Sequence, residues 1–109
     1  KNEILLVNFF ASWCIPCIAE HDYLFKLKKQ KSIKIYGINY KDDTENLKIW
    51  LKKLGNPYSK IGIDKSGLAG INWGINGVPE SFLIDKMTLD MCKEKLTGVK
   101  KNEALCNVR

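Results

Sequence analysis

The chain has 109 residues, of which 45% are hydrophobic and 28% are charged. This composition supports one folded domain over residues 1–109 and excludes a disordered or low-complexity protein. The net charge is +6, but only Arg109 is Arg and the lysines are scattered without an aromatic recognition motif. We therefore expect no nucleic-acid partner. The most hydrophobic run is interrupted by Asn8 and is shorter than the roughly 20 residues of a membrane helix.

The first part of the chain alternates strand and helix patterns. Ile4–Phe10 is a nearly continuous apolar run, as is typical of a strand covered on both faces. Residues 15–30 place apolar side chains at helical spacing and become Lys-rich at the end, where the helix dipole favours cations. Residues 32–39 alternate apolar and polar side chains and predict a second strand.

A second helix and several shorter elements follow. Residues 44–54 place four apolar side chains on one helical face, with Thr44 as the predicted N-cap and Gly55 as the end of the helix. We then expect a strand, a helical turn, two strands that pair as a hairpin and a last short helix, at residues 60–63, 66–70, 81–84, 89–96 and 101–106. This order predicts an α/β fold with a mixed central sheet and helices on both faces.

The clearest chemical motif is the sequence Trp-Cys-Ile-Pro-Cys at residues 13–17. We expect Cys14 at the amino end of the first helix, where free backbone N–H groups and the helix dipole stabilise a thiolate. Cys17 lies one helical turn later, within reach of a mixed disulfide at Cys14. Pro16 is compatible with the first turn of a helix. The pattern predicts that Cys14 is a nucleophile and Cys17 is the thiol that resolves the intermediate.

The cysteine pair has two other possible interpretations, a zinc site and an inert disulfide. A structural zinc site needs four ligands, but His21 is the only histidine, and Cys92 and Cys106 are fourteen residues apart. An inert structural disulfide is the second alternative. Neither explains why the pair lies between a strand and a helix, so we expect a redox-active disulfide, no metal and no other cofactor.

The segment VNFFASWCIPC resembles the active-site strand and turn of the thioredoxin superfamily, and more specifically the cytochrome c biogenesis thiol:disulfide interchange proteins of the DsbE/CcmG type. The resemblance spans about residues 4–100. It is also carried, in the same order, by residues 19–21, 37–43, 54–58, 77–80 and 82–85. It implies a thioredoxin-like fold and a thiol:disulfide oxidoreductase that works in the reducing direction.

The same resemblance implies a biological setting. Its partners would be apocytochrome c or a thiol protein of cytochrome c maturation, and a membrane protein of the DsbD/CcdA kind would supply electrons. The implied location is the bacterial periplasm, with an N-terminal tether to the inner membrane, and we expect a monomer. Two alternatives stay open: a general periplasmic disulfide reductase or oxidant without a cytochrome role, and a binding module without enzymatic activity.

The resemblance also assigns groove and proton-transfer residues. It implies that Val78 and Pro79 form a cis-proline turn facing the cysteines, with Val78 orienting an extended substrate and Pro79 shaping the groove. Trp13, beside the nucleophile, is expected in the groove or in simple packing. Glu20 and Glu80 are the candidates for proton transfer or redox tuning, with solvated surface carboxylates as the alternative.

Several polar and aromatic residues have two interpretations each. General thioredoxins carry a buried carboxylate six residues before the first cysteine, and this chain has Asn8 there, which cannot act as a base. His21 is either an aid to proton transfer or structural, and residues 40–43 form either a recognition loop or a solvated one. Trp50 and Trp73 are expected in the core or the groove wall. An oxidising compartment makes a second disulfide between Cys92 and Cys106 a further alternative.

Overall fold

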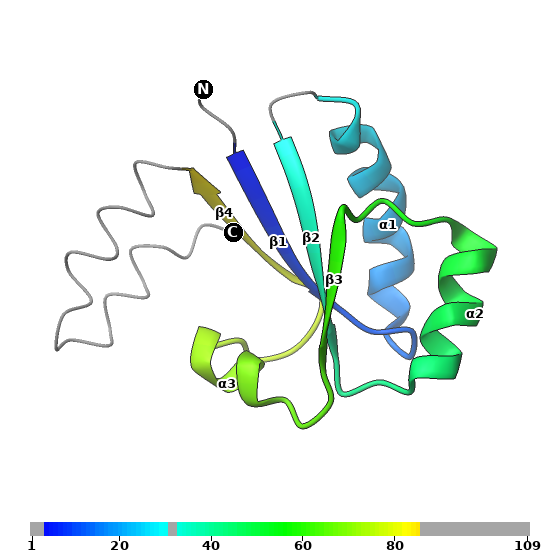
Figure 1. Cartoon of the computed structure of the whole chain (residues 1–109), viewed down its shortest axis with the longest axis vertical. Coiled ribbons are helices and arrows are strands. Elements are labelled where there is room, and N and C mark those ends of the chain that lie inside the picture. The colour runs from blue at the N-terminus through cyan, green and yellow to red at the C-terminus, as the bar shows by residue number, and fades with distance from the viewer. Residues whose placement is uncertain (1–3, 31–32, 86–109) are drawn as a thin grey trace, which may run out of the picture.

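The computed structural model describes residues 4–30 and 33–85, which form a twisted four-stranded sheet with helices on both sides (Figure 1). The elements are β1 (Ile4–Phe10), α1 (Ile15–Lys28), β2 (Ile33–Tyr40), α2 (Thr44–Leu54), β3 (Lys60–Asp64), α3 (Leu68–Trp73) and β4 (Glu80–Asp85). The strand order is β3-β2-β1-β4, in which β1, β2 and β3 are parallel and β4 is antiparallel to β1. The predicted mixed α/β sheet is confirmed.

The larger core lies between the sheet and helices α1 and α2, which cover the same face (Figure 1). Phe10, at the end of β1, is 1% exposed and stacks on Tyr58 and Trp50 with ring centroids 4.5 Å and 5.5 Å away. Leu24 of α1 and Leu47 of α2 are buried in the same cluster. This packing anchors the end of β1 directly before the cysteine motif, because burial of apolar surface is the main stabilising force in a core.

A smaller core lies on the opposite face of the sheet, under α3. Phe9 is fully buried there and makes edge-to-face contacts with Trp73 and Phe82, at centroid distances of 5.7 Å and 5.9 Å. Successive side chains of a strand point to opposite faces, so the adjacent residues Phe9 and Phe10 belong to different cores. Trp73 and Trp50 therefore pack in the two cores rather than in one.

The ends of the elements differ from the predicted ones by up to three residues. The prediction of Thr44 as an N-cap is wrong, because the carboxylate of Asp43 accepts the hydrogen bond from the N–H of Glu45 at 3.3 Å and Thr44 is the first helical residue. Gly55 ends α2 as predicted, with a φ of 93° that favours glycine. The predicted turn at 66–70 is displaced to α3 because Gly67 has a φ of 86°, which is outside the helical region.

Some predictions fall outside the described residues. These are the second strand of the hairpin at 89–96, the last helix at 101–106, and the pairing of Cys92 with Cys106. The first strand of that hairpin, predicted at 81–84, is present as β4. Within residues 4–30 and 33–85, no helix has the length and hydrophobicity needed to cross a membrane.

Candidate active site

The two cysteines of the motif lie where β1 passes into α1. Cys14 is the N-cap of α1, and Cys17 follows in the first turn. The two residues are joined by a disulfide, their Cα atoms are 5.3 Å apart, and they are 3% and 2% exposed. The backbone N–H of Cys17 donates to Sγ of Cys14 at 3.2 Å, and Pro16 occupies the first turn, where helices tolerate proline. The predicted placement of the pair between strand and helix is confirmed.

The loop that precedes Cys14 is held by a buried carboxylate from the loop after β2. Asp42 accepts hydrogen bonds from the backbone N–H of Ser12 at 2.7 Å and from its hydroxyl at 2.9 Å. The side-chain amide of Asn39 and the N–H of Asp43 donate to the same carboxylate at 3.0 Å and 2.8 Å. Burial raises the pKa of Asp42, but the hydrogen bonds outweigh burial and hold that pKa below its ordinary value of 3.8.

Trp13 adds a third connection between these two loops. Its indole N–H donates to the carbonyl of Lys41 at 2.9 Å, while the side chain stays 55% exposed beside the cysteines. Lys41 has a positive φ of 47°, in the left-handed region that residues other than glycine rarely adopt. The loop at residues 40–43 was expected to be a recognition loop or a solvated one. Lys41 and Asp43 are exposed, as in a solvated loop, whereas Asp42 is buried and supports the cysteine turn.

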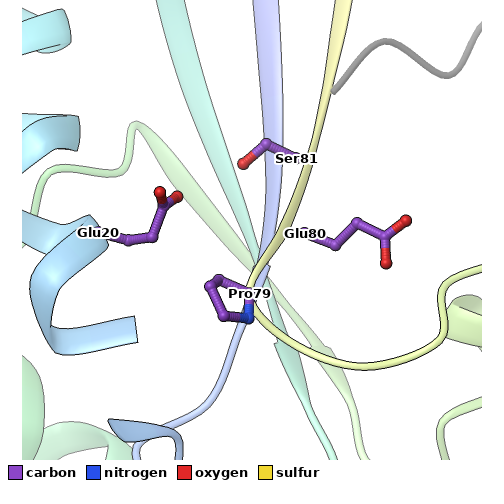
Figure 2. Close-up of a pocket in the computed structure, with 4 residues that line it drawn as sticks. All are labelled: Glu20, Pro79, Glu80 and Ser81. Atoms are coloured by element: carbon purple, nitrogen blue, oxygen red, sulfur yellow. The ribbon is translucent and has the colours of Figure 1, made fainter. Parts of the chain in front are cut away.

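The predicted groove residues lie at the start of β4. The peptide bond between Val78 and Pro79 is cis, as the resemblance implies. Val78 packs against both hydrophobic cores. Pro79 lines an open cavity of about 320 Å³ together with Glu20, Glu80 and Ser81 (Figure 2). The cavity therefore brings the groove proline together with both candidate carboxylates.

The two carboxylates nevertheless point in different directions (Figure 2). Ser81 pairs with Asn8 across the sheet and Glu80 pairs with Phe9, so Glu80 projects to the α3 face and Ser81 to the α1 face. Oε1 of Glu80 accepts the N–H of Asn76 at 3.3 Å. Glu20 extends from α1 into the cavity, on the face that also carries the cysteines. Of the two, Glu20 shares the side of the sheet with the disulfide and Glu80 does not.

Asn8 lies at the centre of a buried polar group. It is 1% exposed, accepts a hydrogen bond from the Tyr58 hydroxyl at 2.8 Å, and donates through Nδ2 to Oγ of Ser81 at 2.9 Å. Burial, and secondarily the negative charge of Glu20, raise the pKa of Tyr58 well above its ordinary value, so this hydroxyl stays protonated. The interior thus contains a neutral hydrogen-bonded chain at the position where general thioredoxins carry a carboxylate.

His21 occupies a structural position. It is 3% exposed, its Nε2 lies 2.6 Å from the carbonyl of Gly55, and its ring meets Trp50 edge-on at a centroid distance of 4.6 Å. These contacts join α1 to the end of α2. Of the two interpretations left open for His21, the packing favours the structural one.

Three residues of this region were not identified as site residues from the sequence. The sequence places Asp42 only within the loop at 40–43 and the family-like segment 37–43, Tyr58 only within the segment 54–58, and Ser81 only at the start of the strand predicted at 81–84. Their roles depend on contacts between residues 30 to 73 positions apart, which no local pattern reveals. One local signal could have indicated Ser81. Consecutive side chains of a strand point to opposite faces, so in a strand that follows Pro79 the side chains of Glu80 and Ser81 lie on different sides of the sheet.

Comparison with known proteins agrees with this geometry. The model of the Redoxin family matches residues 1–88, which is most of the chain. The chain belongs to the Redoxin family. Its curated relatives include the thiol:disulfide interchange protein CycY of Rhizobium leguminosarum bv. viciae, which is 51% identical over 77% of this chain and 45% of its own length. The thiol:disulfide interchange protein DsbE of Vibrio cholerae is 49% identical over 78% of this chain and 46% of its own length.

Solved structures show the same fold. The crystal structure of a DsbF homologue from Corynebacterium diphtheriae superposes with a TM-score of 0.64 and 27% identity, covering 77% of this chain and 57% of that one. This Redoxin domain therefore has the thioredoxin-like fold predicted from its sequence. It spans somewhat less than half the length of the two curated relatives.

Proposed function

We propose that this Redoxin domain is a thiol:disulfide oxidoreductase in which Cys14 is the nucleophile and Cys17 resolves the intermediate. The observation that carries the proposal is the position of Cys14 as the N-cap of α1, with the N–H of Cys17 directed at its sulfur. After reduction, this N–H and the amino end of the helix stabilise a negative charge on the Cys14 sulfur. A stabilised thiolate is the reactive form in disulfide exchange.

The reaction is a two-electron exchange in two steps. In the first, the Cys14 thiolate attacks a partner disulfide, forming a mixed disulfide and releasing one partner thiolate. In the second, Cys17 loses its proton and attacks the Cys14 sulfur, which forms the disulfide present in the structure and releases the second partner thiolate. The partner gains two electrons, and its two released thiolates take up protons from solution. The domain loses two electrons and the proton of Cys17, since Cys14 is already deprotonated when it attacks. The cysteine pair itself carries the electrons, so the proposal needs no cofactor.

Glu20 is the proposed proton acceptor for Cys17. It extends into the open cavity on the cysteine side of the sheet, one helical turn after Cys17. A carboxylate at this place takes the thiol proton as the second step begins and passes it to solvent through the cavity mouth. Glu80, on the opposite face, is assigned a minor part in tuning the potential of the pair through its charge.

The finer proposal is a periplasmic reductant in cytochrome c maturation. It is supported by the resemblance of several ordered segments to the DsbE/CcmG type and by two relatives named thiol:disulfide interchange proteins. The substrate class is then a disulfide in apocytochrome c or in a thiol protein of its maturation. A membrane protein of the DsbD/CcdA kind is the proposed source of electrons, and a tether outside this domain is the proposed attachment. Exposed Trp13 and the Val78–Pro79 turn form the proposed docking groove.

A trapping experiment tests the proposal. Cys17→Ser leaves Cys14 able to attack but unable to be released, so partners accumulate as mixed disulfides. The variant is expressed in a cytochrome-producing bacterium, and the captured proteins are identified by mass spectrometry. Capture of peptides with the CxxCH haem-attachment motif, or of a maturation thiol protein, supports the specific proposal. A broad set of secreted proteins supports a general oxidoreductase, and no capture above the Cys14→Ser, Cys17→Ser control contradicts catalysis.

A further inference from the structure

A buried hydrogen-bonded chain runs from the interior to the cavity beside Pro79. The Tyr58 hydroxyl contacts Oδ1 of Asn8 at 2.8 Å, and Nδ2 of Asn8 contacts Oγ of Ser81 at 2.9 Å. Asn8 and Ser81 are directly opposite each other in the antiparallel pair of β1 and β4. Tyr58 and Asn8 are buried, whereas Ser81 is half-buried and lines the cavity. The chain therefore connects a closed core to an open pocket.

The chemistry of each group fixes the direction of these hydrogen bonds. Oδ1 of Asn8 carries no hydrogen, so Tyr58 is the donor of the first bond. Nδ2 of Asn8 carries only hydrogens, so Oγ of Ser81 is the acceptor of the second. The hydrogen of the Ser81 hydroxyl is left to donate to another group. Figure 2 shows this hydroxyl and the Glu20 carboxylate on the same side of β4, where both face the cavity.

We propose that Ser81 is a positioning residue for proton transfer at Cys17. Its hydroxyl, oriented by Asn8 and Tyr58, faces the cavity that Glu20 also lines, and in the reduced protein it donates a hydrogen bond to the Glu20 carboxylate before that group accepts the Cys17 proton. This inference rests on the function proposed above and deepens it. A hydrogen bond to a carboxylate favours its charged form, which is the form that accepts a proton. When Cys17 attacks the Cys14 sulfur, the Cys17 proton passes to Glu20 and then to solvent, and Ser81 itself loses no proton.

The other groups around Glu20 are consistent with this arrangement. Burial and the charge of Glu20 both raise the pKa of Tyr58, which keeps its hydroxyl a donor to Asn8. Glu80, from β4, projects to the opposite face of the sheet. Cys17, on the same helix as Glu20, is held in the disulfide, and after reduction it is the thiol whose proton Glu20 accepts. Ser81 thus presents the hydroxyl that the sheet directs into the cavity lined by Glu20.

Ser81→Ala tests the inference, with Ser81→Thr as the matched control that keeps the hydroxyl. The reduced protein is loaded with thionitrobenzoate on Cys14 at low pH. Release of the dye, which reports the attack by Cys17, is then followed after jumps to values between about pH 5 and 9. We expect Ser81→Ala to move the acid limb of the rate profile upward by about one pH unit, from the usual strength of a hydrogen bond to a charged group. Ser81→Thr keeps the wild-type profile. A Ser81→Ala profile that superimposes on the wild type overturns the inference.

Two further variants separate this inference from the proposed function. Tyr58→Phe removes the donor that orients Asn8. It is expected to move the acid limb of the rate profile toward higher pH, by less than Ser81→Ala does. In a Glu20→Gln background, Ser81→Ala is expected to add no shift. If Glu20→Gln changes the profile and Ser81→Ala does not, the inference fails and the role of Glu20 stands. If Glu20→Gln changes nothing while the wild type releases the dye, proton transfer by Glu20 and the inference both fail, and the redox function stands.

Discussion

Asp42→Asn is expected to destabilise the domain strongly although it removes only one charge. The carboxylate accepts two donors on each oxygen: the Ser12 N–H and the Asn39 amide on Oδ2, and the Ser12 hydroxyl and the Asp43 N–H on Oδ1. In either orientation, an asparagine at position 42 turns its own NH2 group toward two of these donors. A buried donor without an acceptor costs about 1–3 kcal/mol, so we expect a loss of about 3 kcal/mol in the free energy of unfolding. This is a large part of the ~5–15 kcal/mol typical of a domain.

The pH dependence of this loss follows from the lowered pKa of Asp42. Because the folded-state pKa lies below the unfolded value of 3.8, the carboxylate contributes its full stability above that value and loses it as the pH falls through the folded-state pKa. The difference between wild type and Asp42→Asn is therefore constant from pH 7 down to about pH 4 and narrows below it. Urea unfolding of the oxidised proteins at several pH values measures the difference.

Asp43→Asn is the matched control, since the exposed Asp43 is an N-cap and asparagine caps helices equally well. We expect its free energy of unfolding to stay within about 0.5 kcal/mol of wild type. Equal, small effects of the two substitutions would refute the assignment of Asp42 as the support of the cysteine turn.

Three other substitutions have defined expectations. Gly37→Ala places a Cβ 2.7 Å from Cδ1 of Tyr58 and should lower the free energy of unfolding by about 1–3 kcal/mol in urea titrations, whereas an unchanged midpoint would contradict the packing. His21→Ala removes the 2.6 Å contact with the Gly55 carbonyl and buried ring packing, so a loss of about 2–4 kcal/mol is expected, and a loss below about 1 kcal/mol would argue against the structural role. Trp13→Ala removes a half-exposed ring and one hydrogen bond, so stability should change by less than about 1 kcal/mol while KM for a protein disulfide rises; an unchanged KM would place Trp13 outside the groove.

The elements that position the cysteines are readable from the sequence because their signals are local. Ile4–Phe10 is apolar on both faces, and it lies in the middle of the sheet between β2 and β4. The motif at residues 13–17 follows this strand directly, so the placement of Cys14 at a helix start needed no long-range information. The resemblance added the cis bond before Pro79, for which the chain itself carries no local signal.

The support of the site is not readable in the same way, because it consists of contacts between distant segments. Asp42 is surrounded in the sequence by charged residues, and nothing local shows that it turns inward onto Ser12. The N-cap of α2 was assigned to Thr44 instead of Asp43 because both residue types are good caps and lie side by side. The side of the sheet to which Glu80 points depends on the register of β4, and only the pairing of β4 with β1 sets that register.

The roles of Cys14 and Cys17 are tested by the reaction of the fully reduced protein with glutathione disulfide, with each adduct assigned by peptide mass mapping. We predict that the wild type forms the Cys14–Cys17 disulfide and releases two glutathione molecules per pair. Cys17→Ser should stop with one glutathione on Cys14, and Cys14→Ser should react at Cys17 at least about ten times more slowly, since only Cys14 has the stabilised thiolate. Equal rates of glutathione addition to Cys14 and Cys17 in the two single variants would contradict the assignment of nucleophile and resolving thiol.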